Sequence, residues 1–394
     1  MVGEEQTGIM SLTNFRFLGS GTFGCTFSPA LPCLPTNDVN LGAYQWAELN
    51  PNMAYLTKVV NGAVSGYIEE VLIGQMICEE PTFETFFAPV LQTCAADLTL
   101  LGQSALDQCP IITNITDTST YVVNTIRNVG TDSLTYYLGN EFSYGDASAV
   151  SAIFKTHSHL LAALIKLQTM KDPIVHFDMK GNNVIFDEKI RTPIIIDFGF
   201  SFTKSKLLGS SQDLKQLSEL FWSYNEEKDG DNVNWCIEVD LITYITQRSL
   251  IAEEKTFYSR ITQENINKLF YTVDAYILKS EYGNMRFITS DELEMYRYKQ
   301  KSYLSSFLNM TWVALLDDLF STWQHWDNYA LSLTYATYLE RHFDRIDSLL
   351  PRYTDLLKQS VLALPRQQPT PDRMLSLLHT LHSSNRNPIT SPEL

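Results

Sequence analysis

The chain is poor in the features that mark disulfide-rich, metal-chelating and membrane-spanning proteins. Its six cysteines among 394 residues are scattered and form no C-x-x-C pair, so we expect neither a disulfide framework nor a zinc site. No apolar run reaches the ~18 residues of a membrane span, and no charged start followed by an apolar core opens the chain. These absences predict a soluble, cytoplasmic protein with reduced thiols, in which the sequons at Asn114 and Asn309 carry no glycan. The cysteines are Cys25, Cys33, Cys78, Cys94, Cys109 and Cys236.

Basic residues are also few. The sequence has 29 Lys and Arg against 45 Asp and Glu, a formal net charge of -16. A surface that binds nucleic acid or an anionic membrane needs clustered cations, so we expect neither as a partner. A hydrophobic content of 44% and a charged content of 19% are ordinary for a globular protein, and the length allows about two or three domains.

The most informative stretch is 173–202, where two short apolar runs flank a polar turn. The runs, Asn183–Phe186 and Pro193–Ile196, predict a β-hairpin around Asp187–Lys189. Polar side chains stand at both mouths of this hairpin, which would bring them to one point. Two carboxylates, an amide and an ammonium suit Mg²⁺ and a phosphate. These residues are Asp178, Lys180, Asn183 and Asp197.

The same stretch resembles the catalytic loop and the metal-binding motif of the protein kinase family. The matching string is His176-x-Asp178-x-Lys180-x-x-Asn183, followed by Asp197-Phe198-Gly199. The resemblance implies ATP and Mg²⁺ as cofactors, with Asp178 as the base that receives the substrate hydroxyl proton and Lys180 as a γ-phosphate contact. Asn183 and Asp197 would be the Mg²⁺ ligands. The alternative is a polar turn feeding a core strand, with Asp197 as a strand-end cap.

A glycine-rich turn lies upstream, between a strand that begins at Phe15 and one that begins at Cys25. In a kinase its backbone amides would close over the triphosphate, although a simple hairpin turn has the same pattern. A dinucleotide-binding fold would need a helix directly after the glycines, and Pro29, Pro32 and Pro35 exclude that helix. The nucleotide-binding residues predicted here are Gly19, Ser20, Gly21, Thr22, Phe23 and Gly24.

Two further residues resemble the ion pair that orients the α- and β-phosphates in kinases. Lys58 lies in an apolar strand at 54–60, and Glu70 lies in a predicted helix at 65–78. We choose Glu70 over Glu69 because it precedes the apolar positions of that helix. The alternatives are an exposed strand lysine and a carboxylate that stabilises the first turn of a helix. Runs at 86–91 and 121–123 predict two more strands.

The second half of the chain follows the kinase pattern less closely. Residues 124–138 resemble the hinge and the helix after it, and 148–170 form a wide apolar helical stripe. There is no A-P-E string, and 235–238 resembles a degenerate counterpart. Asp327 resembles the aspartate that ties down the catalytic-loop backbone, and Gln368 stands where an arginine is expected, which puts the usual ion pair of the large lobe in question.

Together these features predict an α+β, bilobal, protein-kinase-like fold. A small lobe at 14–127 would hold an antiparallel sheet and one helix, and a large, mainly helical lobe at 128–383 would carry a helical insertion at about 203–320, before a tail at 384–394. The combination resembles serine/threonine kinases of large nucleocytoplasmic DNA viruses, which implies protein substrates and a location in the host cytoplasm or the virion. The alternatives are a pseudokinase scaffold and a small-molecule, aminoglycoside-type phosphotransferase. None of the key residues is missing, which counts against a pseudokinase; these are Lys58, Asp178, Asn183 and Asp197. Lys180 and the intact D-F-G string count against an aminoglycoside-type phosphotransferase.

One position bears on regulation. Many kinases have an arginine before the catalytic aspartate, and a phosphate on the activation loop neutralises its buried charge. Here that position is Phe177, which has no charge to neutralise. The sequence therefore predicts constitutive activity, with Thr203, Ser205, Ser210 and Ser211 as ordinary surface hydroxyls.

Overall fold

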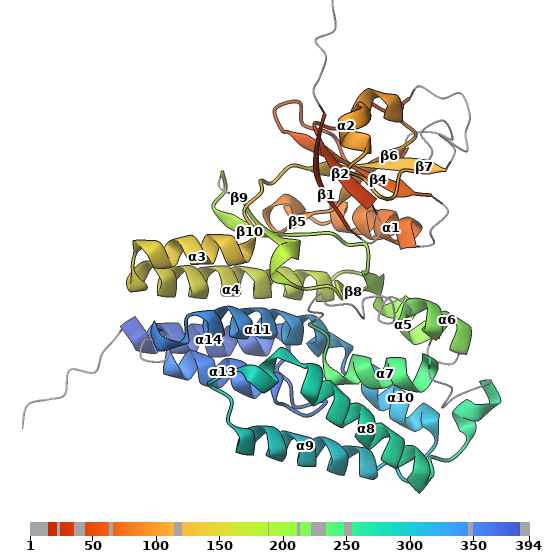
Figure 1. The fold of residues 1–394 in the computed structure, drawn as a ribbon, viewed down its shortest axis with the longest axis vertical. Helices are drawn as coiled ribbons and strands as arrows, with labels where there is room; N and C mark the ends of the chain where they lie inside the picture. Colours follow the sequence, from red (N-terminus) through yellow and green to blue (C-terminus); the bar gives the residue numbers. More distant parts are fainter. Residues whose placement is uncertain are drawn as a thin grey trace, which may run out of the picture. The chain divides into compact units, whose positions relative to one another are not determined.

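The computed structural model describes residues 15–21, 24–34, 44–62, 66–113, 120–187, 189–210, 213–221, 234–247, 254–345 and 350–386. The chain divides into two compact units, one formed by 1–81 and 88–128 and the other by 82–87 and 129–394 (Figure 1). Helices and small antiparallel sheets make up the fold, so the α+β class predicted from the sequence is confirmed.

A six-stranded sheet forms the first unit, with strand order β1-β2-β4-β7-β6-β3 and antiparallel pairing between neighbours. The glycine-rich stretch joins β1 to β2 as a hairpin, as predicted, and the predicted strands at 54–60 and 121–123 are β4 and β7. The strands are β1 (Arg16–Ser20), β2 (Gly24–Ser28), β3 (Tyr44–Gln45), β4 (Tyr55–Asn61), β6 (Val90–Cys94) and β7 (Tyr121–Arg127).

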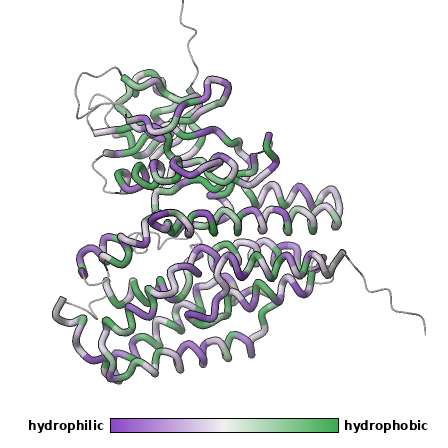
Figure 2. The backbone as a smooth tube through the Cα atoms, turned by 180° about the vertical axis from the view of Figure 1, so that it is seen from behind, coloured by the Kyte–Doolittle hydropathy of each residue, from purple (hydrophilic) through white to green (hydrophobic). Residues whose placement is uncertain are grey.

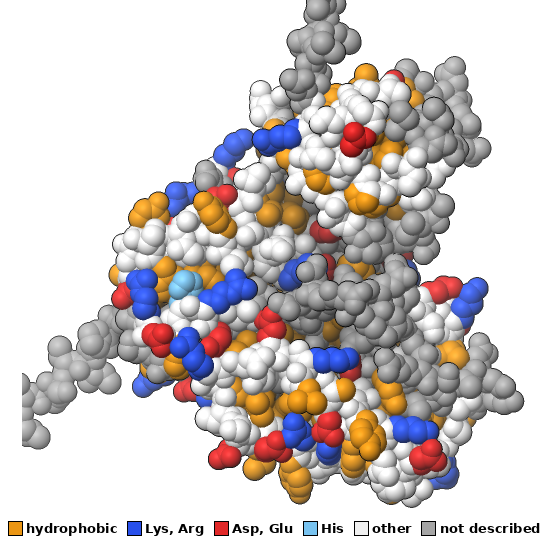
Figure 3. Space-filling view, viewed as in Figure 1, with side chains coloured by type: hydrophobic (Ala, Val, Ile, Leu, Met, Phe, Trp, Pro, Cys, Tyr) orange, Lys and Arg blue, Asp and Glu red, His pale blue; other side chains and the backbone are white. Residues whose placement is uncertain are grey.

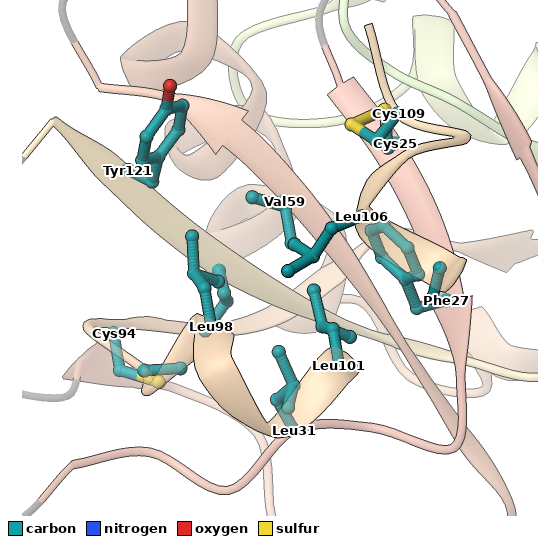
Figure 4. Packing of buried hydrophobic residues seen from close by; sticks show 13 residues of the cluster. Cys25, Phe27, Leu31, Val59, Cys94, Leu98, Leu101, Leu106, Cys109 and Tyr121 are labelled. Carbon is teal, nitrogen blue, oxygen red and sulfur yellow. A yellow bond between two sulfur atoms is a disulfide. The ribbon is translucent and has the colours of Figure 1, made fainter. Parts of the chain in front are cut away.

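Both faces of this sheet are covered. Helix α1 (Gly66–Cys78) packs on one face so closely that a Cβ on Gly74 would lie 2.6 Å from the Val90 carbonyl oxygen. The opposite face carries alternate strand residues such as Phe27 and Val59, which pack beneath the short helices η2 (Leu98–Leu101) and α2 (Gln103–Leu106). Figure 4 shows Leu98, Leu101 and Leu106 turned toward this cluster. The sequence did not predict this second layer.

Two disulfides cross-link this unit. Cys25 of β2 bonds to Cys109 after α2 and so ties the second layer to the sheet (Figure 4). Cys33, which follows β2, bonds to Cys94 at the end of β6. The prediction of reduced cysteines is therefore wrong for these four. Its criterion was a short C-x-x-C spacing, whereas the bonded pairs are 84 and 61 residues apart. Disulfides persist in oxidising surroundings, so the cysteines no longer support a cytoplasmic location. Cys78 and Cys236 form no disulfide.

The second unit is mainly helical. Two hairpin strands, β9 (Val184–Asp187) and β10 (Thr192–Ile196), pair antiparallel as predicted, and β10 also pairs with β5 (Phe87–Ala88). The short strand β8 (Ile174–Val175) precedes this hairpin in sequence and pairs antiparallel with β11 (Phe202–Thr203), which follows it. Five helices of this unit pack against one another: α3 (Leu134–Tyr144), α4 (Asp146–Gln168), α11 (Trp323–Arg341), α13 (Pro351–Val361) and α14 (Pro371–Arg386).

The described residues of 203–320 are largely helical. Helices α8 and α9 begin with capping boxes, in which the side chains of Thr262 and Thr289 accept hydrogen bonds from backbone amides of the first turn. Hydrophobic and hydrophilic positions alternate along these helices in Figure 2, as expected when one side of a helix is buried. The helices are α5 (Lys204–Ser210), α6 (Leu214–Leu220), α7 (Ile237–Gln247), α8 (Gln263–Lys279), α9 (Ser290–Ser305) and α10 (Trp312–Phe320).

Two observations concern partners. Within the described residues, no helix combines the length and apolarity that crossing a membrane requires. On the face shown in Figure 3, the described Lys and Arg side chains are interspersed with Asp and Glu and form no continuous basic area.

Candidate active site

The first unit holds a buried ion pair. The Lys58 Nζ atom lies 2.7 Å from Oε1 of Glu70, and both side chains are almost completely buried. Lys58 is in β4 and Glu70 is in α1, so the pair ties the central strand to the helix on that face of the sheet. A buried charge is stable only when it is paired. Glu70, and not Glu69, is therefore the partner, in agreement with the sequence prediction.

The glycine-rich hairpin belongs to the same unit. Gly19 and Ser20 end β1, Gly24 starts β2, and the Gly21 amide donates to the Gly24 carbonyl at 2.9 Å. A Cβ on Gly24 would lie 2.5 Å from the Val59 carbonyl oxygen, so the pairing of β2 with β4 requires glycine there. A Cβ on Gly19 or Gly21 would meet no atom within 4 Å. Thr22 and Phe23 lie outside the described residues.

The second unit brings three of the predicted polar residues into contact. The Asn183 side-chain amide donates to Oδ2 of Asp178 at 2.6 Å and to its backbone carbonyl at 2.9 Å. The Lys180 Nζ atom lies 3.1 Å from the same Oδ2. Asp178 and Asn183 are buried, whereas Lys180 is 28% exposed in its side chain. Two donors thus fix the orientation of one carboxylate, and the ammonium remains within reach of a ligand.

Asp327 of α11 holds the backbone that carries this carboxylate. Its two oxygens accept hydrogen bonds from the backbone amides of His176 and Phe177, each at 2.8 Å. Burial raises the pKa of Asp327 to about 6, although these two hydrogen bonds act in the opposite direction. Phe177 has a φ of 67°, a conformation that is strained for a residue with a bulky side chain. Ser201 adds a third contact by donating to the His176 carbonyl at 3.0 Å.

His176 connects the loop to the strand that ends at Asp197. Its Nε2 lies 3.1 Å from the Ile196 carbonyl, and its Nδ1 accepts from the Asp178 amide at 3.3 Å. This arrangement requires a neutral imidazole that donates from Nε2, and burial lowers the pKa of His176 to about 4. Since Asp197 directly follows Ile196, the contact of His176 with the Ile196 carbonyl places the Asp197 backbone beside the loop. Asp197 also has a positive φ, 59°.

The donor set can be tested against Mg²⁺. No group of three or more His, Cys, Asp or Glu side chains within the described ranges could hold a metal ion. A site made of Asn183 and Asp197 has one amide and one carboxylate oxygen, and Mg²⁺ accepts few protein ligands when substrate phosphates and water complete its shell. Since the Asn183 nitrogen is committed to Asp178, its oxygen remains the candidate metal ligand. An amide oxygen and a carboxylate are ligand types that suit Mg²⁺ bound together with a phosphate.

The segment that resembles a degenerate A-P-E string lies at the start of α7. Glu238 is fully buried, and its Oε1 accepts from the Gln368 amide at 3.3 Å. Burial raises the pKa of Glu238 to about 7. The Gln368 amide thus contacts Glu238 at the position where the resemblance to kinases predicts an arginine. For this reason the sequence already put the usual ion pair in question. The sequence did not predict one contact of the loop that carries Asp178, in which the Trp235 indole donates to the Phe177 carbonyl next to Asp178.

Comparison with known proteins gives no assignment. No protein-family model matches the chain, and no curated protein matches it significantly.

Proposed function

We propose that the chain is a Mg²⁺- and ATP-dependent protein kinase of bilobal fold that transfers the γ-phosphate to serine or threonine hydroxyls of protein substrates. The observation that carries the proposal is the meeting of Asp178, Lys180 and Asn183 on a loop whose backbone is held by a buried aspartate. The alternative, a polar turn that only feeds a core strand, gives no reason for an ammonium and an amide to converge on one buried carboxylate. The resemblance to kinases of large nucleocytoplasmic DNA viruses belongs to the same proposal.

Each residue has a defined part in this reaction. Asp178 accepts the proton of the attacking hydroxyl, and the contacts to Oδ2 from Asn183 and Lys180 hold the carboxylate in one orientation. Lys180 also offers its charge to the transferred phosphoryl group. In the first unit, Glu70 holds the Lys58 ammonium, which would bind phosphate oxygens.

A metal ion would supply charge neutralisation between the β- and γ-phosphates, and Asn183 and Asp197 are the residues that would hold it. The protein's own contribution is mostly positioning. A correctly placed base contributes about 10²–10⁴-fold, and the clamped loop keeps that base within hydrogen-bond reach of a bound hydroxyl.

The test is phosphate transfer by the purified full chain from radiolabelled ATP and Mg²⁺. Mixed proteins, small alcohols and aminoglycosides are offered as acceptors in parallel. We expect label on serine and threonine of proteins. Label on small alcohols or aminoglycosides alone would indicate a small-molecule phosphotransferase, and ATP binding without any transfer would indicate a pseudokinase scaffold.

A matched pair of variants separates the catalytic carboxylate from other carboxylates. Asp178→Asn is expected to abolish transfer and leave ATP·Mg²⁺ affinity within a few-fold, because the base contacts the hydroxyl and not the nucleotide. Asp172→Asn is the control, since Asp172 accepts a backbone hydrogen bond from Ser205 and lies outside the loop. Near-normal turnover by Asp178→Asn would overturn the assignment of the base.

A further inference from the structure

Trp235 is in direct contact with the catalytic loop. Its indole Nε1 donates to the Phe177 carbonyl at 2.5 Å, and the two rings stack with centroids 5.1 Å apart and planes 27° apart. Both side chains are buried. Since Phe177 directly precedes Asp178, this hydrogen bond fixes the peptide unit that carries the proposed base.

The Phe177 backbone is strained and needs such contacts. A non-glycine residue with positive φ is strained and persists only where its surroundings hold it. Here Asp327 accepts from the Phe177 amide, and Trp235 donates to its carbonyl, so both backbone polar groups are held. Loss of either partner would allow the loop to relax toward a less strained conformation.

Trp235 lies within the helical insertion and is held there by contacts with helix α8, while its neighbour Asn234 contacts α11. The Trp235 backbone carbonyl accepts from the Tyr276 hydroxyl of α8 at 2.8 Å, and this hydroxyl also lies 2.7 Å from that of Tyr329 on α11. The preceding residue, Asn234, donates to the Thr334 hydroxyl of α11 at 2.8 Å. A continuous set of contacts therefore runs from α8 through Trp235 to the loop.

We propose that Trp235 is a positioning residue for Asp178, and that Tyr276 of the insertion holds Trp235 in place. The inference rests on the proposed kinase function and gives the insertion a role in catalysis. Trp235 acts on the base through the Phe177 peptide. Its loss therefore lowers the rate of the chemical step. Misplacement of a reacting group by about 1 Å can cost about 10²-fold in rate, so a decrease of about tenfold or more in kcat is expected.

The decisive variant is Trp235→Phe, which keeps an aromatic ring in the stack and removes only the N–H donor. Its matched control is Trp326→Phe. Trp326 belongs to the same buried aromatic cluster around Phe177, but its indole donates to the Thr322 hydroxyl at 3.1 Å and not to the loop. Measurements are kcat, KM for ATP, equilibrium ATP affinity, melting temperature, and hydrogen exchange of the peptide 174–180.

A second pair tests the connection to the insertion. Tyr276→Phe removes the hydroxyl that donates to the Trp235 carbonyl, whereas Tyr271→Phe changes a 75% exposed tyrosine on the same helix. We expect Trp235→Phe and Tyr276→Phe to lower kcat with unchanged ATP affinity and to speed exchange in 174–180. We expect both controls to leave these quantities unchanged.

Equal kcat and equal exchange in Trp235→Phe and Trp326→Phe would overturn the inference, even if both variants melt at a lower temperature. Absence of transfer by the unmodified protein would overturn the proposed function instead. In that case the exchange comparison alone decides whether Trp235 holds the loop.

Discussion

Removal of the Cys25–Cys109 disulfide is a direct test of the layer that covers the sheet of the first unit. The bond joins residues 84 apart, but Cys33–Cys94 lies inside that span and already closes most of it. The additional loop that Cys25–Cys109 closes is therefore only about two dozen residues long, and the chain-entropy relation gives about 3.4 kcal/mol for it. Cys25→Ala combined with Cys109→Ala should lower the stability of this unit by about that amount.

The assay should resolve the two units, because a single melting curve mixes their transitions. Hydrogen exchange of the β4 and β7 peptides, 55–61 and 121–127, reports opening of the sheet. A loss of about 3.4 kcal/mol corresponds to roughly 300-fold faster exchange. Exchange in α8 of the second unit serves as an internal control and is expected to stay unchanged.

Two results would refute this reasoning. One is unchanged exchange in β4 and β7 after the double substitution, which would mean that the bond adds nothing to the packed layer. The other is titration of six thiols in denatured, unreduced protein, since four of the six cysteines are joined in disulfides in the structure.

Three further predictions concern the site. Lys58→Met and Glu70→Gln should each strongly lower turnover while Glu69→Gln does not; a silent Glu70→Gln beside a damaging Glu69→Gln would refute the assigned ion pair. The buried Glu238 carboxyl, with its pKa raised to about 7, keeps a proton that the unfolded chain releases, so stability falls as pH rises from about 4.5 through 7. Glu238→Gln should remove this loss, on the order of 3 kcal/mol at pH 8, and parallel melting profiles of variant and parent from pH 5 to 8 would contradict it. Because Phe177 lies uncharged among aromatic rings, phosphatase treatment should leave turnover unchanged, and a tenfold drop would show that another cation depends on a phosphate.

The local elements of this protein could be predicted because their signals lie within short windows of sequence. Two short apolar runs around a polar turn predicted the hairpin that the structure shows as β9 and β10, and the wide apolar stripe at 148–170 matches helix α4. The choice of Glu70 could also be made from the sequence, because its position on α1 relative to the apolar residues directs it toward the sheet. Each of these inferences needed only the geometry of one strand or one helix.

Other features depended on residues that are distant in sequence, and only the tertiary structure revealed them. Asp327 was anticipated through a family resemblance, but the distances that make it a backbone clamp came from the packing of α11 against the loop. The Trp235 contact with Phe177 spans 58 residues, and no local spacing encodes it.

The second layer of the first unit shows most clearly which features the local sequence predicts and which depend on tertiary packing. The sequence determined that Cys25 and Val59 lie in strands, because the apolar pattern there is local. It did not determine that residues 98–109 fold back over those strands, or that Cys109 meets Cys25. Burial of apolar area drives such folding back and does not depend on sequence separation, so a cysteine's partner is decided by which surfaces pack together.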